Sequence, residues 1–478
     1  MFGKRTDTPQ GATPALKPVE SPKPSAPQTA AAEKPAESHK PAEPPKPAAP
    51  VSTPANPRME RARKRIWTDL RDGIDLKSLS RMDAEAARAE ILSAVQEIGQ
   101  FRGLDVTPAE LAQIAKEAAD DMLGFGPLEE LLAQEGIADI MINGPKTIYI
   151  ETKGKIQRAG IEFRDNHHLL TICQRVVGVI GRRVDESSPI CDARLPDGSR
   201  VNVIIPPLAV DGCTMTIRKF AKEKLTLDKL IEFKAMTPAC AEMIKIIGAC
   251  RANVVISGGT GSGKTTMLNC LTRYMSEGER VITCEDACEL QLQQPHVVRL
   301  ETRPPNLEGV GEVKMRDLIK NCLRMRPDRI IVGEVRGPEA FDLLQAMNTG
   351  HDGSMGTVHS NNPREALTRI ENMIAMGGLN LPTAAVREQI ASAVNVIIQV
   401  QRLRDGSRKV THITEITGME GEVVTMQDLF RFEYEGEDEF GRIIGKQKSS
   451  GLRPILFERA RQYGLEKKLL DVMAEAYT

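Results

Sequence analysis

Residues 253–271 read NVVISGGTGSGKTTMLNCL, and this stretch decides the fold class of the chain. The apolar run at 254–256 predicts a buried strand, and residues 267–271 continue as a helix. Between them lies the pattern G-x-x-x-x-G-K-T, whose glycines let successive backbone N–H groups turn toward phosphate oxygens. Strand, loop and helix therefore follow one another in the order that a phosphate-binding loop (P-loop) requires.

The predicted P-loop supplies the candidate nucleotide-binding residues. They are Gly258, Gly259, Thr260, Gly261, Ser262, Gly263, Lys264, Thr265 and Thr266. Lys264 would add a cation beside the phosphates, and the Thr265 hydroxyl could ligate Mg²⁺. The predicted ligands are ATP and Mg²⁺, because a glycine-rich turn without a ligand would not need the Lys and Thr of the pattern.

Hydrolysis also needs a group that orients and activates water near the terminal phosphate. The run 329–332 predicts a buried strand that ends at Gly333-Glu334, and open parallel sheets place ligands at that end of their strands. Glu334 is the predicted general base. Gly333 stands where many P-loop proteins have an Asp that holds Mg²⁺, so Glu285, after the strand 281–283, is predicted to steer Mg²⁺ or water, directly or through water. Asp286 is compatible with catalysis and with helix capping alike.

Two histidines lie in glycine-rich segments after the acidic strand. His351 is in TGHDG at 349–353, and His359 is in GTVHSN at 356–361. A loop of this kind could sense the terminal phosphate, and each histidine could equally be a hydrogen-bonded structural residue. Their order after the other motifs favours the first interpretation.

Composition bounds the class of protein. With 478 residues and 41% hydrophobic residues, the chain is long enough for about three folded units. Lys and Arg number 64 against 65 for Asp and Glu, which gives no overall field for a polyanion, so direct nucleic-acid binding is not expected. No apolar run approaches about 18 residues, which predicts a cytoplasmic protein that touches membranes through partners. The nine scattered cysteines are predicted to be core residues, and no metal beyond Mg²⁺ is expected.

The chain divides into five predicted segments. Residues 1–58 are rich in Pro and Ala and predict a disordered tail, and 59–126 show helical periodicity that predicts a small bundle. Short alternating strands and a helix predict an N-terminal α+β domain at 127–218, followed by a linker at 219–236. Residues 237–478 alternate apolar strands with helices, which predicts an α/β domain with a mostly parallel sheet.

Four motifs stand in series: the P-loop, the acidic Glu285-Asp286, the strand end at 333–336 and the histidine segment at 350–359. The combination resembles the type II and type IV secretion ATPase superfamily (PulE/VirB11-like), and it is most similar to the CpaF/TadA branch, the motors of tight-adherence pili. Supporting similarity lies at 139–144, 192–200, 325–329 and 333–337, within about 120 to 435.

The resemblance implies a RecA-like P-loop core, a PAS-like N-terminal α+β domain and a homohexameric ring that holds ATP between the two domains. It also gives Arg194, Arg200 and Arg218 a role at the phosphates, which suits planar, multidentate guanidinium groups. Without the resemblance these arginines would be solvated surface charges. Branches that drive type II secretion carry a four-cysteine zinc insertion, which this chain lacks, so the similarity favours the CpaF/TadA and VirB11-like branches.

The function that this resemblance implies is a hexameric cytoplasmic ATPase that couples hydrolysis to assembly or retraction of a tight-adherence, type IV-like pilus. Its expected partners are inner-membrane pilus platform proteins, so it would lie peripherally at the inner-membrane face. The first alternative is a VirB11-like ATPase of a type IV secretion system that moves protein or DNA. A nucleotide-dependent scaffold and a small-molecule kinase are further alternatives, but Glu334 argues against the scaffold and no acceptor-binding motif supports the kinase.

Overall fold

The computed structural model describes residues 57–74, 76–79, 81–152, 154–220, 225–305, 309–379 and 381–477. The tail predicted at 1–58 lies outside the described residues except for its last two positions. Within the described ranges, no helix is long and apolar enough to span a bilayer.

A helical bundle comes first among the described residues. It contains α1 (Pro57–Gly73), α2 (Leu76–Leu79), α3 (Ala84–Phe101) and α4 (Pro108–Leu123). Fully buried side chains such as Ile66, Ile91 and Ile114 form its core. Helix α4 begins after Thr107 with a capping box, since the Thr107 and Glu110 side chains and backbone N–H groups bond reciprocally.

The next unit is an α+β domain built on a six-stranded antiparallel sheet of order β3-β2-β1-β6-β5-β4. Its elements are α5 (Leu128–Ala133), β1 (Ile137–Asn143), β2 (Ile148–Thr152), β3 (Lys155–Arg158), α6 (Asn166–Gly178), β4 (Ile190–Arg194), β5 (Arg200–Ile204) and β6 (Thr214–Arg218). Apolar side chains alternate along β1 and β5 and pack against one face of α6, so one face of this sheet is buried and the other carries polar side chains.

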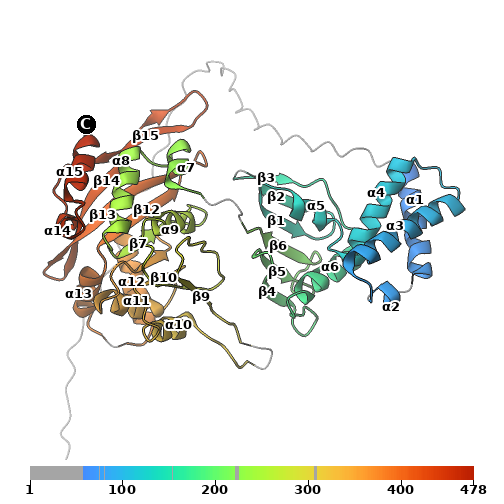
Figure 1. Ribbon diagram of the computed structural model, residues 1–478, viewed down its shortest axis with the longest axis horizontal. Helices are drawn as coiled ribbons and strands as arrows, with labels where there is room; N and C mark the ends of the chain where they lie inside the picture. Colours follow the sequence, from blue (N-terminus) through green and yellow to red (C-terminus); the bar gives the residue numbers. More distant parts are fainter. Residues whose placement is uncertain are drawn as a thin grey trace, which may run out of the picture. The chain divides into compact units, whose positions relative to one another are not determined.

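The C-terminal domain contains a nine-stranded sheet of order β15-β14-β13-β12-β7-β11-β10-β8-β9 (Figure 1). Its parallel strands are β7 (Val254–Ser257), β8 (Val281–Glu285), β9 (Val297–Glu301), β10 (Arg329–Val332), β11 (Met355–Val358) and β12 (Val396–Arg402). The antiparallel strands β13 (Arg408–Glu420), β14 (Val423–Glu437) and β15 (Ile443–Ser449) extend the β12 side. The parallel part agrees with the sequence prediction, whereas the long antiparallel extension was not predicted.

Helices cover both faces of this sheet. One face packs against α7 (Leu227–Glu232), α8 (Pro238–Ala249), α9 (Lys264–Thr272), α14 (Leu456–Gln462) and α15 (Glu466–Glu475). The other packs against α10 (Met315–Cys322), α11 (Glu339–Asn348), α12 (Pro363–Met376) and α13 (Thr383–Ala393). Along β7, Val254 and Ile256 enter the first core and Val255 the second, as the two-residue period of a strand buried on both faces requires.

This α/β core confirms the predicted fold class, and its strand order places the P-loop strand β7 between β11 and β12, as in RecA-like folds. The parallel strands β7, β8, β10 and β11 all end at one edge of the sheet, so the segments after them converge there. Part of the segment predicted as a linker, 219–236, is helical, since α7 lies within it. All nine cysteines are buried and unpaired, in agreement with the prediction that they are core residues.

Candidate functional site

The P-loop connects β7 to α9. Gly261 and Gly263 adopt left-handed backbone conformations, with φ of 68° and 98°, which side chains with a Cβ rarely accept. A Cβ at Gly258 would overlap the backbone oxygen of Val400, so the loop also needs glycine there for space. Gly263 precedes the first residue of α9, and the loop therefore delivers its backbone N–H groups and the helix N-terminus to one place.

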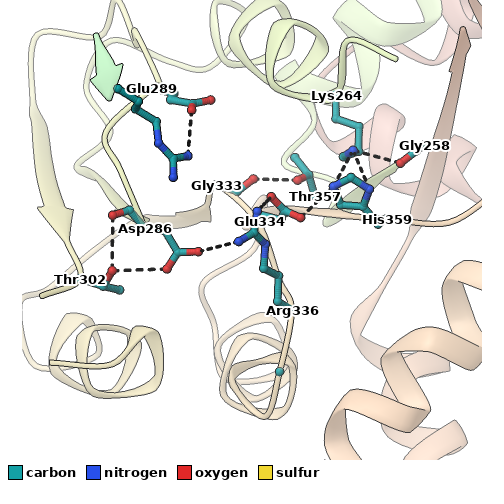
Figure 2. Close-up of polar contacts among 12 residues, drawn as sticks. Gly258, Lys264, Asp286, Glu289, Thr302, Gly333, Glu334, Arg336, Thr357 and His359 are labelled. Atoms are coloured by element: carbon teal, nitrogen blue, oxygen red, sulfur yellow. Dashed lines mark hydrogen bonds and ion pairs between the residues drawn. The ribbon is translucent and has the colours of Figure 1, made fainter. Parts of the chain in front are cut away.

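The side chain of Lys264 folds back onto the P-loop. It is 8% exposed, and Nζ donates to the backbone oxygens of Gly258 and Gly259, each at 3.0 Å. Nζ also lies 3.2 Å from Nε2 and 3.5 Å from Nδ1 of His359 (Figure 2). Burial lowers the pKa of Lys264, and the charge of Glu334 opposes this shift.

Glu334 follows β10 directly and joins the lysine through His359. Its Oε1 lies 2.9 Å from His359 Nε2, and its Oε2 accepts a hydrogen bond of 2.7 Å from Arg336 Nη2. Burial alone would raise the pKa of Glu334, but the hydrogen bond and charge of Arg336, with His359 and Lys264, hold that pKa below its usual value. The carboxylate is therefore ionised at neutral pH, as a general base must be.

His359 is neutral in this arrangement because burial and the charge of Lys264 lower its pKa. A neutral ring with its proton on Nε2 satisfies both neighbours, since Nε2–H donates to Glu334 and Nδ1 accepts from Lys264. Lys264, His359, Glu334 and Arg336 thus form a continuous polar chain from the P-loop to the end of β10 (Figure 2). The structure brings together the residues that the sequence selected at three separate motifs.

Glu285 ends β8 and is almost completely buried, at 2% exposure. Its Oε2 accepts from the backbone N–H groups of Glu289 (2.7 Å) and Leu290 (2.8 Å), and burial nevertheless raises its pKa. A Cβ at Gly333 would lie 3.0 Å from Glu285 Cγ, so Glu285 occupies the space that an Asp at 333 would need. The position suits the predicted steering of Mg²⁺ or water, which stays a prediction, while the hydrogen bonds show that the carboxylate also supports the loop after β8.

Asp286 does not cap a helix in this structure. Its carboxylate lies 3.3 Å from Thr302 Oγ1 and 3.6 Å from Arg336 Nη1, and Figure 2 shows it between these two residues. Arg336 therefore bridges Asp286 and Glu334. Of the two roles left open for Asp286, the structure argues against helix capping, and a catalytic role stays a prediction.

His351 is a correction to the sequence prediction. The residue precedes β11, and its Nδ1 lies 3.3 Å from the backbone oxygen of Ala346. Its own backbone oxygen accepts from Ser354 Oγ, which in turn accepts from the N–H of Ile330 at the start of β10. His351 is thus at the amino ends of β10 and β11, whereas parallel strands present a shared ligand edge at their carboxyl ends, where His359 lies.

The three candidate arginines form one row across the antiparallel sheet of the α+β domain. Arg194 on β4 pairs with Arg200 on β5, and Arg200 pairs with Arg218 on β6. Like charges placed directly opposite one another destabilise a sheet unless anionic groups compensate them. In this structure each guanidinium meets a carboxylate: Arg194 contacts Glu301 (3.2 Å), Arg200 contacts Glu289 (3.3 Å) and Arg218 contacts Asp139 (3.1 Å).

Comparison with known proteins supplies the family. The family model described as "Type II/IV secretion system protein" matches residues 121–431. The chain belongs to this family. The match includes the arginine row, the P-loop, both acidic strand ends and His359.

Relatives of this secretion family member are known by sequence and by structure. A putative conjugal transfer protein of Mycobacterium tuberculosis is 39% identical over 309 residues, which span 63% of this chain and 87% of that protein. The type IV secretion system protein VirB11 of Bartonella henselae is 30% identical over 328 residues, 60% of this chain and 90% of the relative. Among solved structures, the VirB11 ATPase of Brucella suis in complex with sulphate is 25% identical, with a TM-score of 0.33 over 60% of this chain and 94% of its own.

The P-loop of this family member fits a magnesium-bound nucleotide. Ser262 Oγ is buried and has no hydrogen-bond partner among the described residues, so the cradle offers an unused polar atom. No cluster of three or more His, Cys, Asp or Glu residues in the described ranges could hold a metal by itself. Mg²⁺ is commonly held by few protein groups together with phosphate oxygens and water, so Thr265, the second residue of α9, would supply its hydroxyl only with a nucleotide present.

A pocket adjoins the same helix. Its lining includes Arg200 and Arg218 of the arginine row and Thr265, Thr266 and Asn269 of α9. The pocket therefore has polar side chains from both the arginine row and α9.

Arg336 is the site residue to which sequence reasoning assigned no role. It belongs to the motif 333–336 and contacts Glu334 of the same motif, but its second partner, Asp286, becomes visible only when β8 and β10 are placed side by side. The sequence signal that could have identified it is its position two residues after the predicted base, Glu334.

Proposed function

We propose that this secretion family protein is an ATP hydrolase that works as the motor of a transfer machine. The observation that carries the proposal is the polar chain from Lys264 through His359 to Glu334 at the edge where β7, β10 and β11 end. It joins a phosphate-binding cation to an ionised carboxylate within one contiguous set of contacts. A scaffold that only binds nucleotide would need the phosphate-binding cation but not the ionised carboxylate.

In the proposed reaction, the P-loop N–H groups and Lys264 hold the β- and γ-phosphates of ATP. Phosphate oxygens are stronger partners for the ammonium than the neutral oxygens of Gly258 and Gly259, so Lys264 exchanges its present acceptors for phosphate. Thr265 would hold Mg²⁺ together with the phosphates, and the ion would supply positive charge where negative charge develops on them. Glu334 orients the attacking water and accepts its proton.

His359 would couple the binding of phosphate at Lys264 to the position of the proposed base, Glu334. It contacts Lys264 and Glu334 together, so a movement of the lysine toward phosphate changes the hydrogen bonds of the proposed base. Because the ring is neutral, its Nε2–H fixes the Glu334 carboxylate without competing for the proton that Glu334 must accept.

The arginine row would complete the site from a second domain. Guanidinium groups of Arg194, Arg200 and Arg218 can exchange their carboxylate partners for phosphate oxygens, with which they form charge-assisted hydrogen bonds. We propose a homohexameric ring in which each site uses arginines from the domain that adjoins it, so that binding and release of nucleotide change the angle between domains. Turnover per subunit should then rise with protein concentration.

The relatives indicate the class of machine. One is named a putative conjugal transfer protein and another a type IV secretion system protein, and both match over most of their own length. We therefore propose that the motor serves a VirB11-like machine that transfers macromolecules at the inner-membrane face, which it reaches through membrane partners.

A tight-adherence pilus of the CpaF/TadA type is the second candidate. The sequence similarity at 139–144 and 192–200 supports it, while the absence of a four-cysteine zinc insertion from the sequence is compatible with both candidates.

Two experiments test these proposals. Phosphate release from ATP by the purified full-length protein tests the hydrolase, and acceptor-independent release would exclude a kinase. A Glu334→Gln allele in the native cell, expressed at the normal level, tests the machine: loss of macromolecule transfer supports the first candidate, and loss of surface pili with transfer intact supports the second. If both macromolecule transfer and surface pili are retained, the proposed motor function is wrong.

A further inference from the structure

Strand β12 and the P-loop strand β7 are parallel neighbours, with Ile398 opposite Ile256 and Gln399 opposite Ser257. The register brings the end of β12 beside the start of the P-loop, where the backbone of Val400 leaves no space for a side chain at Gly258. The hairpin that joins β12 to β13 therefore packs directly against the P-loop, although it lies more than 130 residues away in the sequence.

Two arginines of this hairpin, Arg402 and Arg408, face each other as cross-strand partners. Nε of Arg408 donates to the backbone oxygen of Gly261 at 2.8 Å. Nη1 of Arg402 lies 3.8 Å from the point where a Cβ of Gly261 would be. Both guanidinium groups therefore lie beside Gly261 of the P-loop.

The local charge balance distinguishes this pair from an ordinary surface pair. In the described part of the chain, neither arginine forms an ion pair: Arg402 donates to the neutral backbone oxygen of Gly154 (3.0 Å), and Arg408 to that of Gly261. The hairpin's own carboxylate, Asp405, accepts from Ser407 instead. Like charges opposite one another are unfavourable unless an anion compensates them, and the loop beside them is built to hold one.

The bond to Gly261 also orients the phosphate cradle. Carbonyl oxygen and N–H of a trans peptide point in opposite directions, so holding the Gly261 oxygen toward Arg408 turns the Ser262 N–H away from the hairpin. That N–H now donates to the Gly259 oxygen at 3.4 Å, a long hydrogen bond that a phosphate oxygen can replace.

We propose that Arg402 and Arg408 form a basic clamp on the P-loop that favours nucleotide di- and triphosphates. Arg408 is a positioning residue, which holds the Gly261–Ser262 peptide in the orientation that presents its N–H to phosphate. The two charges together raise the affinity of the loop for polyphosphate anions. The clamp rests on the nucleotide site proposed above and adds to it a source of affinity outside the four motifs.

The test measures binding of fluorescent ADP and ATP analogues to the full-length protein and its variants at several salt concentrations. In Arg408→Gln, the dissociation constant should rise about tenfold, as expected when a charged hydrogen bond to the loop is lost. KM for ATP should rise with it, while kcat should change little because the clamp acts before the chemical step. Affinity in the variant should also depend less steeply on salt.

Arg404→Gln is the matched control. Arg404 lies in the same hairpin and has the same charge, but its guanidinium pairs with Glu437. This variant should bind within about twofold of the unmodified protein, since a surface pair contributes little. Arg408→Lys, which keeps the charge and changes the geometry, should recover the salt dependence and only part of the affinity. Equal thermal unfolding of all variants shows that each is folded.

Lys264→Ala separates failure of the clamp from failure of the nucleotide site. If Lys264→Ala loses binding while Arg408→Gln and Arg404→Gln bind equally well, the clamp is wrong and the site stands. If the unmodified protein binds no nucleotide, or Lys264→Ala binds as well as it does, the nucleotide site is wrong and the clamp falls with it.

Discussion

Glu334→Gln is the substitution whose outcome the structure specifies most closely. The carboxylate offers one oxygen to His359 Nε2 at 2.9 Å and the other to Arg336 Nη2 at 2.7 Å. Glutamine has the same size but a single oxygen, so it can satisfy one of these donors and presents an NH₂ group to the other. The P-loop itself is untouched, and nucleotide binding should survive.

The rate should fall much further than the affinity. Glutamine cannot accept the proton of the attacking water, and a general base contributes on the order of 100 to 10,000-fold in rate. That range corresponds to about 2.7 to 5.4 kcal/mol of activation free energy. The loss should appear in kcat, because the carboxylate acts in the transition state and contributes little to ground-state binding.

The assay is phosphate release at saturating ATP and Mg²⁺, alongside binding of a fluorescent ATP analogue. Glu371→Gln is a matched control, since Glu371 forms a comparable two-oxygen contact with Arg387 (3.0 and 3.3 Å) away from the P-loop. Its rate should stay near that of the unmodified protein. A Glu334→Gln variant that binds ATP and hydrolyses it at the unmodified rate would refute the assignment of the base.

Three further predictions concern the surrounding groups. The pKa of His359 lies below its ordinary value of 6.5, so the ring is more than half neutral at pH 6.5. If the rate needs the neutral ring, kcat should fall by less than half between pH 7.5 and pH 6.5, and a larger fall in the pH profile would contradict this role. Glu285→Gln should weaken the response to Mg²⁺, and a titration should restore part of its rate at high Mg²⁺; no recovery would leave Glu285 with its loop-supporting role alone. Glu279→Gln should lower the free energy of unfolding by about 3 to 5 kcal/mol, because it leaves the fully buried Arg329 without its carboxylate, whereas Glu433→Gln at an exposed pair should cost less than about 1 kcal/mol in the same denaturant titration.

The parts of the site that sequence predicts are those encoded locally. The P-loop residues and Glu334 each follow an apolar strand within a few positions, so the strand's carboxyl end and the functional residue are read from the same short segment. His359 satisfies the same rule after β11. His351 does not, because seven residues, among them the whole of β11, lie between it and His359. The motif that contains both histidines gave no indication of which one lies at the ligand edge.

The parts that sequence could not predict depend on pairing between distant strands. Arg336 acquires Asp286 as a partner only because β8 and β10 are neighbours in register. Arg402 and Arg408 reach the P-loop only because β12 adds to β7, a pairing across roughly 140 residues. The alternation of apolar residues predicts that a strand exists, but many neighbours satisfy the same alternation, so the order of strands has to come from the three-dimensional structure.

The central claim is that the P-loop and the chain from Lys264 to Glu334 hydrolyse ATP. The most direct measurement is the steady-state rate of phosphate release by the purified full-length protein and by Lys264→Ala, both shown to be folded and of the same oligomeric state. We predict Mg²⁺-dependent release by the unmodified protein and a loss of at least about tenfold in both turnover and nucleotide affinity in the variant, because the variant lacks the cation that faces the phosphates. Equal release by the two proteins would contradict the account.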